Sequence, residues 1–215
     1  MRKMITGLVF LMSGTLATAE PVTIAALGDS LTQGYGLPIE DGLVQKLQTW
    51  LTDQGAEVAL INAGVSGDTT AGGAARVDWA LTPEVDAMIV ALGANDLLRG
   101  IDPASSRANM EVILSGARDR NVPVLLIGFE APGNFGPDYK ASFDAIYPEL
   151  ADAFGALYLD SFFKGLETVT TDPAAMRAFL QPDGLHPNAD GVDRIVEGIG
   201  PSVLDLIALV ESEAE

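Results

Sequence analysis

The chain has 215 residues, of which 48% are apolar, and this is enough to build one ordinary globular domain. Its formal net charge is −18 at pH 7, which argues against binding to nucleic acids or anionic membrane surfaces, because both need Lys and Arg contacts. Cysteine is absent, so disulfides contribute nothing to stability and no thiol is available for an N-terminal lipid anchor.

The first nineteen residues have the pattern of a signal peptide. Arg2 and Lys3 precede a short apolar run at 4–16, and Ala17-Thr18-Ala19 supplies a small-x-small cleavage site. The apolar run is shorter than the roughly 20 residues that a bilayer-spanning helix needs. We therefore predict a signal peptide at 1–19 with cleavage near Ala19. The remaining single domain, 20–215, is expected to be periplasmic or secreted, without a stable membrane anchor.

Short apolar runs alternate with longer amphipathic segments in the rest of the chain. Strands are predicted at 22–27, 57–62, 87–92, 123–128 and 157–159, and helices near 41–54, 70–80, 104–120, 138–155 and 189–210. Five such β-α units predict an α/β fold with a parallel sheet that is covered by helices on both faces.

Unusual polar sequences follow the first three predicted strands directly. These are Gly28-Asp29-Ser30, the segment 63–68, and Gly93-Ala94-Asn95-Asp96. In open parallel sheets, ligands bind in the crevice outside the carboxyl ends of the strands. The three segments therefore indicate a binding site at this edge of the sheet.

The chain contains a single histidine, His186, in a turn-rich loop before the last predicted helix. A histidine in such a loop can simply be an exposed residue. Asp183, however, lies three positions earlier and can accept the Nδ1 proton, and Pro182 and Pro187 stiffen the segment between them. This arrangement favours His186 as a general base that Asp183 orients.

Ser30 is the nucleophile that such a base would activate. It follows an apolar strand and precedes an expected helix start, where free backbone N–H groups can stabilise a developing oxyanion. Ser30 could instead be a helix N-cap, and the two roles are compatible. Thr32 occupies the second glycine position of a G-x-S-x-G nucleophile elbow, which disfavours the α/β-hydrolase fold.

Four blocks of the chain resemble the GDSL, or SGNH, hydrolase family. They are Gly28-Asp29-Ser30-Leu31, the segment from Asn62 to Asp68, the segment from Gly93 to Asp96, and the segment from Asp183 to His186. All four occur in family order across 28–186. The second block, the sequence after Asn95 and the segment 145–148 are similar to the periplasmic thioesterase/lysophospholipase/arylesterase group of that family.

The resemblance implies a flavodoxin-like three-layer α/β/α sandwich with a five-stranded parallel sheet. It also implies a triad of Ser30, Asp183 and His186, and an oxyanion hole formed by Ser30, Gly67 and Asn95. The expected activity is hydrolysis of carboxylic esters and thioesters, in particular aryl or acyl esters of short to medium chain and lysophospholipid-like substrates. Gly64 is a competing candidate for the second donor, and both Gly67 and Asn95 could instead be plain turn residues.

The expected partner is a small-molecule acyl ester, with no cofactor and no metal. The carboxylates show no His or Cys cluster at metal-ligand spacing. An apolar acyl groove is predicted at Leu97, Leu98, Ile101, Pro132 and Phe135.

Two alternatives stay open. The first is a carbohydrate acetyl esterase of the same superfamily, which polar and aromatic sugar platforms would favour. The second is a non-catalytic acyl-binding protein that keeps the fold, against which the intact Ser, Asp and His argue.

Overall fold

The computed structural model describes residues 21–213, and the predicted signal peptide lies outside this range. Its centre is a five-stranded parallel sheet in the order β2-β1-β3-β4-β5. The strands are β1 (Val22–Gly28), β2 (Val58–Gly64), β3 (Ala87–Ala91), β4 (Val124–Ile127) and β5 (Leu157–Leu159). Every one of them overlaps a predicted strand. The three inner strands, β1, β3 and β4, are runs of mostly apolar residues that are buried almost throughout, whereas the edge strands β2 and β5 are partly exposed.

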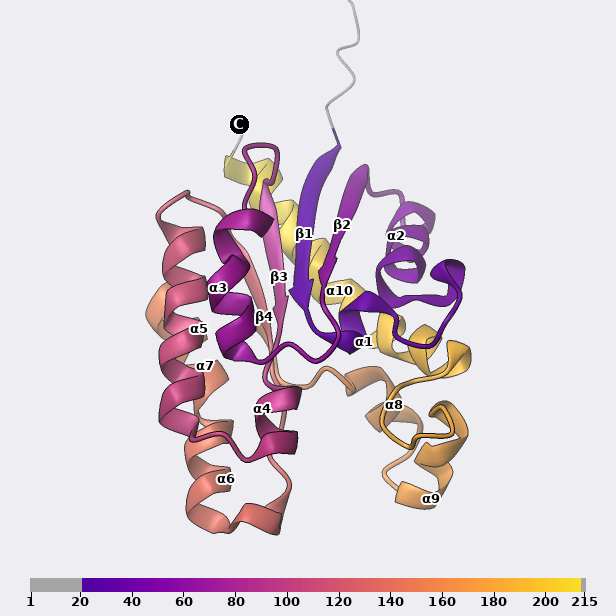
Figure 1. The fold of residues 1–215 in the computed structure, drawn as a ribbon. Helices are drawn as coiled ribbons and strands as arrows, with labels where there is room; N and C mark the ends of the chain where they lie inside the picture. Colours follow the sequence, from indigo (N-terminus) through magenta and orange to yellow (C-terminus); the bar gives the residue numbers. More distant parts are fainter. Residues whose placement is uncertain (1–20, 214–215) are drawn as a thin grey trace, which may run out of the picture.

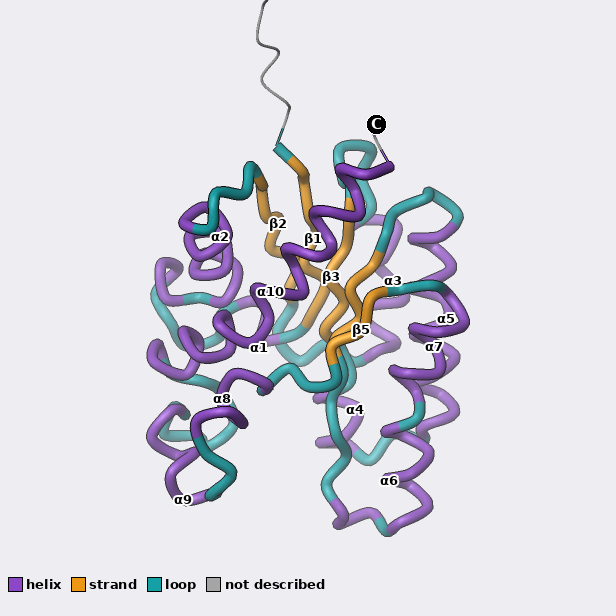
Figure 2. The backbone as a smooth tube through the Cα atoms, turned by 180° about the vertical axis from the view of Figure 1, so that it is seen from behind, coloured by secondary structure: helices purple, strands orange, loops and turns teal. Residues whose placement is uncertain are grey.

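Helices cover both faces of the sheet, which confirms the predicted three-layer α/β/α architecture. The longer helices are α2 (Leu43–Asp53), α3 (Thr70–Ala80), α5 (Pro103–Arg118), α6 (Pro137–Asp144), α7 (Ile146–Phe154) and α10 (Ala189–Glu213). Figures 1 and 2 show α3, α5 and α7 on one face and α2 and α10 on the other. In Figure 1 α10 lies behind the sheet, and in Figure 2 it lies in front.

The helix predicted at 138–155 is in fact two helices, α6 and α7, that meet at Ala145. Pro148 lies in the first turn of α7. Proline has no N–H to donate, so it is tolerated in a first turn but breaks the hydrogen-bond ladder of a continuous helix. The prediction of a single helix through this segment was therefore wrong.

Several short helices were given no predicted range, although a helix start was expected after Ser30. They are α1 (Ser30–Gln33), α4 (Ala94–Arg99), α8 (Lys164–Val169), α9 (Pro173–Met176) and the 3-10 turns η1 (Ile39–Asp41), η2 (Gly133–Phe135) and η3 (Arg177–Phe179). Two of them, α1 and α4, carry polar residues of the first and third sequence blocks. Both end at a glycine in the left-handed region, Gly34 with φ 85° and Gly100 with φ 59°.

The segment between β5 and α10 forms a helical excursion at the carboxyl edge of the sheet, beside α10 (Figure 1). Its helix α8 crosses α10 very closely at Gly165 and Gly198. A Cβ on Gly165 would lie 1.7 Å from the carbonyl oxygen of Arg194, so only glycine fits at this crossing. The close crossing fixes the excursion next to the sheet edge where polar side chains gather.

The two open edges of the sheet are terminated differently. At the β2 edge, the side-chain amide of Gln48 donates to the carbonyl of Val58 and accepts from the N–H of Leu60, both at 2.8 Å. At the opposite edge, β5 has only three residues. Within the described range of 21–213, no helix combines the length and apolarity that crossing a membrane requires.

Candidate active site

Ser30 is the first residue of α1, directly beyond the carboxyl end of β1. The preceding Asp29 caps this helix, because its Oδ1 accepts the N–H of Leu31 at 3.0 Å. Ser30 itself is therefore not the N-cap. Its side chain is almost buried, with 8% of the residue exposed, and its hydroxyl faces a cavity.

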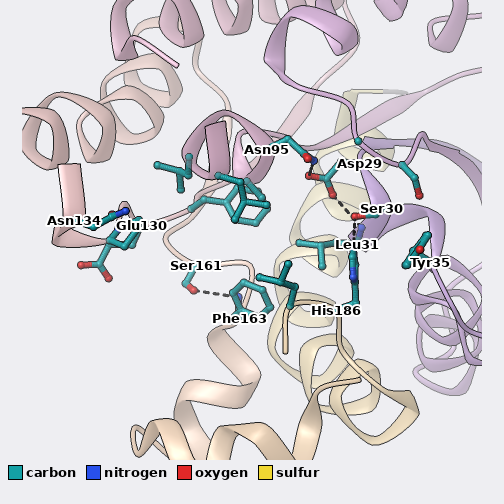
Figure 3. A pocket seen from close by; sticks show the side chains of 18 of the residues that line it. Asp29, Ser30, Leu31, Tyr35, Asn95, Glu130, Asn134, Ser161, Phe163 and His186 are labelled. Atoms are coloured by element: carbon teal, nitrogen blue, oxygen red, sulfur yellow. Dashed lines mark hydrogen bonds between the residues drawn. The ribbon is translucent and has the colours of Figure 1, made fainter. Parts of the chain in front are cut away.

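The loop from Asp183 to His186 places the imidazole on the Ser30 hydroxyl. Asp183 Oδ1 accepts the N–H groups of Leu185 and His186 at 2.9 and 3.0 Å, and its Oδ2 lies 2.6 Å from His186 Nδ1. His186 Nε2 lies 2.8 Å from Ser30 Oγ. With the ring proton on Nδ1, Nε2 can accept the serine proton. The structure thus brings Ser30, His186 and Asp183 into one hydrogen-bonded line, part of which appears in Figure 3.

The hydrogen bond from His186 lowers the pKa of Asp183 to about 2, and the two backbone N–H groups act in the same direction. Each donor favours the ionised carboxylate. Asp183 therefore stays negatively charged over the whole pH range in which an imidazole gains or loses its proton.

Gln181 joins the histidine loop to the segment after Ser30, which the sequence did not indicate. Its Nε2 donates to the carbonyls of Tyr35 and Pro187 at 2.8 and 2.9 Å, and its backbone N–H donates to His186 O at 2.7 Å. The Tyr35 ring lies against the imidazole, with ring centroids 4.6 Å apart. Tyr35 and His186 are far apart in the sequence, so no local pattern signals this contact.

Three residues that line the cavity beside the Ser30 hydroxyl carry hydrogen-bond donors with free capacity. Among the described residues, no hydrogen bond uses the backbone N–H of Ser30 or that of Gly67. The side-chain amide of Asn95 uses one of its two N–H bonds, donating to Asp29 Oδ2 at 3.0 Å. All three residues line the cavity. Uncommitted donors beside a nucleophile are what stabilisation of an oxyanion requires.

Gly64, the competing second-block residue, does not line this cavity. Its N–H donates to Asn62 Oδ1 at 3.0 Å, and a Cβ on it would lie 2.4 Å from the backbone nitrogen of Gln33. Gly64 therefore serves the close packing of β2 against α1.

The two aspartates near the site differ in their surroundings. Asp29 is fully buried, and burial raises its pKa above the usual value although the N–H of Leu31, the Asn95 amide and the charge of His186 act in the opposite direction. Asp68 instead binds Arg76 at 2.6 Å. The same guanidinium donates to the carbonyls of Ala63 and Gly28, so Asp68 helps to tie the ends of β2 and β1 together.

The cavity beside Ser30 has a volume of about 620 Å³ and is mainly apolar. Of the predicted groove residues, Leu97, Leu98, Pro132 and Phe135 line it. Ile101 is not among the residues that line it. The helix α4 ends at Arg99, before Ile101, and the Ile101 carbonyl accepts the hydroxyl of Tyr139 at 2.9 Å outside the cavity lining.

Other residues that line the cavity were not predicted. These further lining residues include Phe129, Phe163 and Leu185, and Figure 3 shows Glu130 and Asn134 at the end far from Ser30. Phe129 comes two residues after β4, so the argument from strand ends could have found it. Phe163 had no such signal, because it belongs to the unpredicted excursion after β5.

Comparison with known proteins gives consistent matches over most of the chain. The profile of the GDSL-like Lipase/Acylhydrolase family matches residues 26–194. The arylesterase of Vibrio mimicus is 34% identical over 198 residues, which are 92% of this chain and 94% of the relative. The thioesterase 1/protease 1/lysophospholipase L1 of Escherichia coli K12 is 32% identical over 200 residues, 92% of this chain and 91% of the relative. Among solved structures, the SGNH-hydrolase family esterase AlinE4 is 41% identical with a TM-score of 0.70, covering 88% of this chain and 98% of the other.

Proposed function

The chain belongs to the GDSL-like lipase/acylhydrolase family and is a serine esterase, in which we propose that Ser30 attacks the ester carbonyl with His186 as its base. The observation that carries this assignment is the line of contacts from Ser30 Oγ to His186 Nε2 at 2.8 Å and from His186 Nδ1 to Asp183 Oδ2 at 2.6 Å.

The proposed reaction has two halves. In the first, His186 takes the Ser30 proton as Oγ bonds to the carbonyl carbon, and the resulting imidazolium then protonates the leaving alcohol or thiol. In the second, His186 takes a proton from water, which attacks the acyl-serine and releases the acid and the free hydroxyl. Asp183 stays ionised and holds the ring with its proton on Nδ1.

The negative charge that develops on the carbonyl oxygen is assigned to the N–H groups of Ser30 and Gly67 and to the amide of Asn95. The support is that the residues carrying these three donors line the cavity and keep hydrogen-bonding capacity for a ligand. Asp29 accepts the other N–H of Asn95 and so orients that amide. Positioned donors of this kind can be the largest single contribution to ester hydrolysis.

A fluorophosphonate probe tests this proposal directly. Ser30 Oγ is expected to displace fluoride and become phosphonylated, and peptide mass spectrometry should locate the adduct at Ser30. A protein that binds acyl esters but does not react with the probe would be a non-catalytic binder. An adduct at another serine would contradict the assignment of the nucleophile.

The rate of hydrolysis is expected to rise with pH as His186 loses its proton, because only neutral imidazole can accept the proton of Ser30. Asp183 does not contribute to this change, since it ionises near pH 2. The chain has one histidine, so its NMR titration can be assigned without a series of mutants. A rate profile that does not follow this titration would argue against His186 as the base.

We propose aryl and acyl esters of short to medium chain as substrates, together with thioesters and lysophospholipid-like esters. Support comes from the apolar lining of the cavity and from the names of the two curated relatives. Each buried methylene contributes at most about 0.8 kcal/mol, which is about a fourfold gain in kcat/KM. That gain should stop where Glu130 and Asn134 replace the apolar wall.

A series of p-nitrophenyl esters measures this limit, with Phe135→Ala as the test variant. Phe135 is expected to contribute to kcat/KM for medium acyl chains but not for acetate, because acetate is too short to reach along the wall. Val112→Ala, an exposed apolar position on α5, is the control. Strict preference for acetylated sugars, or a steep rise in rate above the micellar threshold of the substrate, would contradict an open acyl groove.

We further propose that the enzyme is exported and acts in the periplasm or outside the cell. The support is the charged start, the apolar run and the Ala17-Thr18-Ala19 site of the first nineteen residues. N-terminal sequencing of the processed protein is expected to begin at Glu20, and an uncleaved N-terminus would contradict this proposal.

A further inference from the structure

The three proposed oxyanion donors come from three separate segments of the chain. Ser30 lies on α1 and Asn95 on α4, whereas Gly67 lies in the loop between β2 and α3. Donors must be held within about 0.5 Å of their productive positions to stabilise a transition state. Ser30 and Asn95 are held in place by their helices. Gly67 lies in a loop, so other contacts must hold its N–H in position.

The Gly67 N–H belongs to the central peptide of a four-residue turn. The N–H of Asp68 closes this turn on the carbonyl of Val65 at 3.1 Å, and Gly67 has φ 82°. Positive φ at the third position is typical of a type II turn and favours glycine. The turn leaves the Gly67 N–H unpaired among the described residues, so the turn alone does not determine the direction of that bond.

Gln33 holds the peptide that precedes the central one. Its Oε1 accepts the N–H of Ser66 at 3.1 Å and also accepts the Ser66 hydroxyl. Gln33 is the last residue of α1, three positions after Ser30. The first half of the turn is therefore attached to the helix that carries the nucleophile.

Arg99 holds the peptide that follows the central one. Its guanidinium donates to the carbonyl of Gly67 at 2.8 Å. Arg99 is the last residue of α4, four positions after Asn95, and Gly100 ends the helix immediately after it. The second half of the turn is therefore attached to the helix that carries the third donor.

We propose that Gln33 and Arg99 are positioning residues of the oxyanion hole, which fix the direction of the Gly67 N–H from either side. This inference rests on the proposed roles of Ser30, Gly67 and Asn95. Neither side chain lines the cavity, so both act through the turn and not on the substrate. Each side chain connects the turn to a helix that carries another donor, so the positions of the three donors are linked.

The experiment compares kcat and KM of Gln33→Met, Arg99→Met and the double variant. Methionine keeps much of the side-chain length but removes the hydrogen bond. Each single variant is expected to lower kcat by about 10-fold, because misplacement by about 1 Å can cost up to about 100-fold. The double variant should lose about 10²–10³-fold, as if one donor were missing. KM should stay within about twofold, since the interaction strengthens only as charge develops.

Conservative replacements and matched controls separate positioning from stability. Gln33→Glu keeps an acceptor for Ser66 and should retain most of kcat. Gln45→Met on α2 and Arg194→Met on α10 remove the same side-chain types at exposed positions. These controls should match the wild type in kcat, and the melting temperatures of the test variants should lie close to theirs.

Asn95→Ala separates failure of this inference from failure of the proposed function. If Asn95→Ala loses about 10²–10³-fold in kcat but the double methionine variant equals its controls, the positioning role is wrong and the oxyanion hole stands. If Asn95→Ala keeps its kcat, the proposed hole itself is wrong. A loss of kcat in Gln33→Met that Gln33→Glu does not restore would also overturn the role of Gln33. If the double variant does not fold, the two single variants and Gln33→Glu decide the question.

Discussion

Ser30→Ala is expected to lower kcat by about 10⁵–10⁶-fold while leaving the fold intact. Within residues 21–213 the hydroxyl makes one side-chain hydrogen bond, to His186, so its removal costs the folded state little. His186→Ala should lose a similar factor, and the double variant should be no worse than either single one, because the two residues act as a unit. Activity with a p-nitrophenyl ester and the melting temperature are the two measurements.

Retention of even a tenth of wild-type activity in Ser30→Ala would rule out this serine as the nucleophile. Ser105→Ala is a matched control, because Ser105 lies at an exposed position on α5 and does not line the cavity. This control should stay near wild-type activity.

Asp183→Asn should have the second largest effect, a loss of about 10³–10⁴-fold in kcat. An amide can accept the two backbone N–H groups through its oxygen only by turning its NH₂ toward His186 Nδ1. Nδ1 must then accept, the ring proton moves to Nε2, and Nε2 can no longer take the proton of Ser30. The opposite orientation of the amide would leave both backbone N–H groups without an acceptor.

The effect of Asp183→Asn should persist at every pH at which the enzyme is active, because the wild-type carboxylate is ionised down to about pH 2. Its lowered pKa also means that the stabilising contribution of Asp183 is complete above its usual pKa of 3.8 and is lost as the pH falls through about 2. Asp152→Asn, at an exposed position on α7, serves as the control. A lower melting temperature with unchanged kcat would indicate that Asp183 only stabilises the loop that carries His186.

The parts of the site that could be predicted from the sequence are those determined by local spacing. Asp183 and His186 are three residues apart in a turn, so their contact depends on one loop. The strands were predictable because a buried parallel strand is a continuous apolar run. The placement of Ser30 beyond β1 followed from the same argument, since the ends of adjacent strands in a parallel sheet share one edge.

The parts that could not be predicted depend on contacts between distant segments. Nothing in the local sequence distinguishes Arg99, and only the folded chain shows that it binds the carbonyl of Gly67, 32 positions away. Gln181 likewise meets Tyr35 across 146 positions. Phe163 enters the cavity because glycines pack α8 closely against α10, and no local periodicity encodes that crossing.

The amide of Gln48 has a consequence for how copies of this protein behave at high concentration. An exposed edge strand with free N–H and C=O groups is a template on which another chain can extend the sheet, the first step of strand-mediated aggregation. Gln48 already fills the partner positions of Val58 and Leu60, and the opposite edge, β5, offers only three residues. Neither edge therefore presents a long unpaired ladder. The sheet therefore offers little free edge for another copy to extend, and the negative net charge of the chain adds repulsion between neighbours.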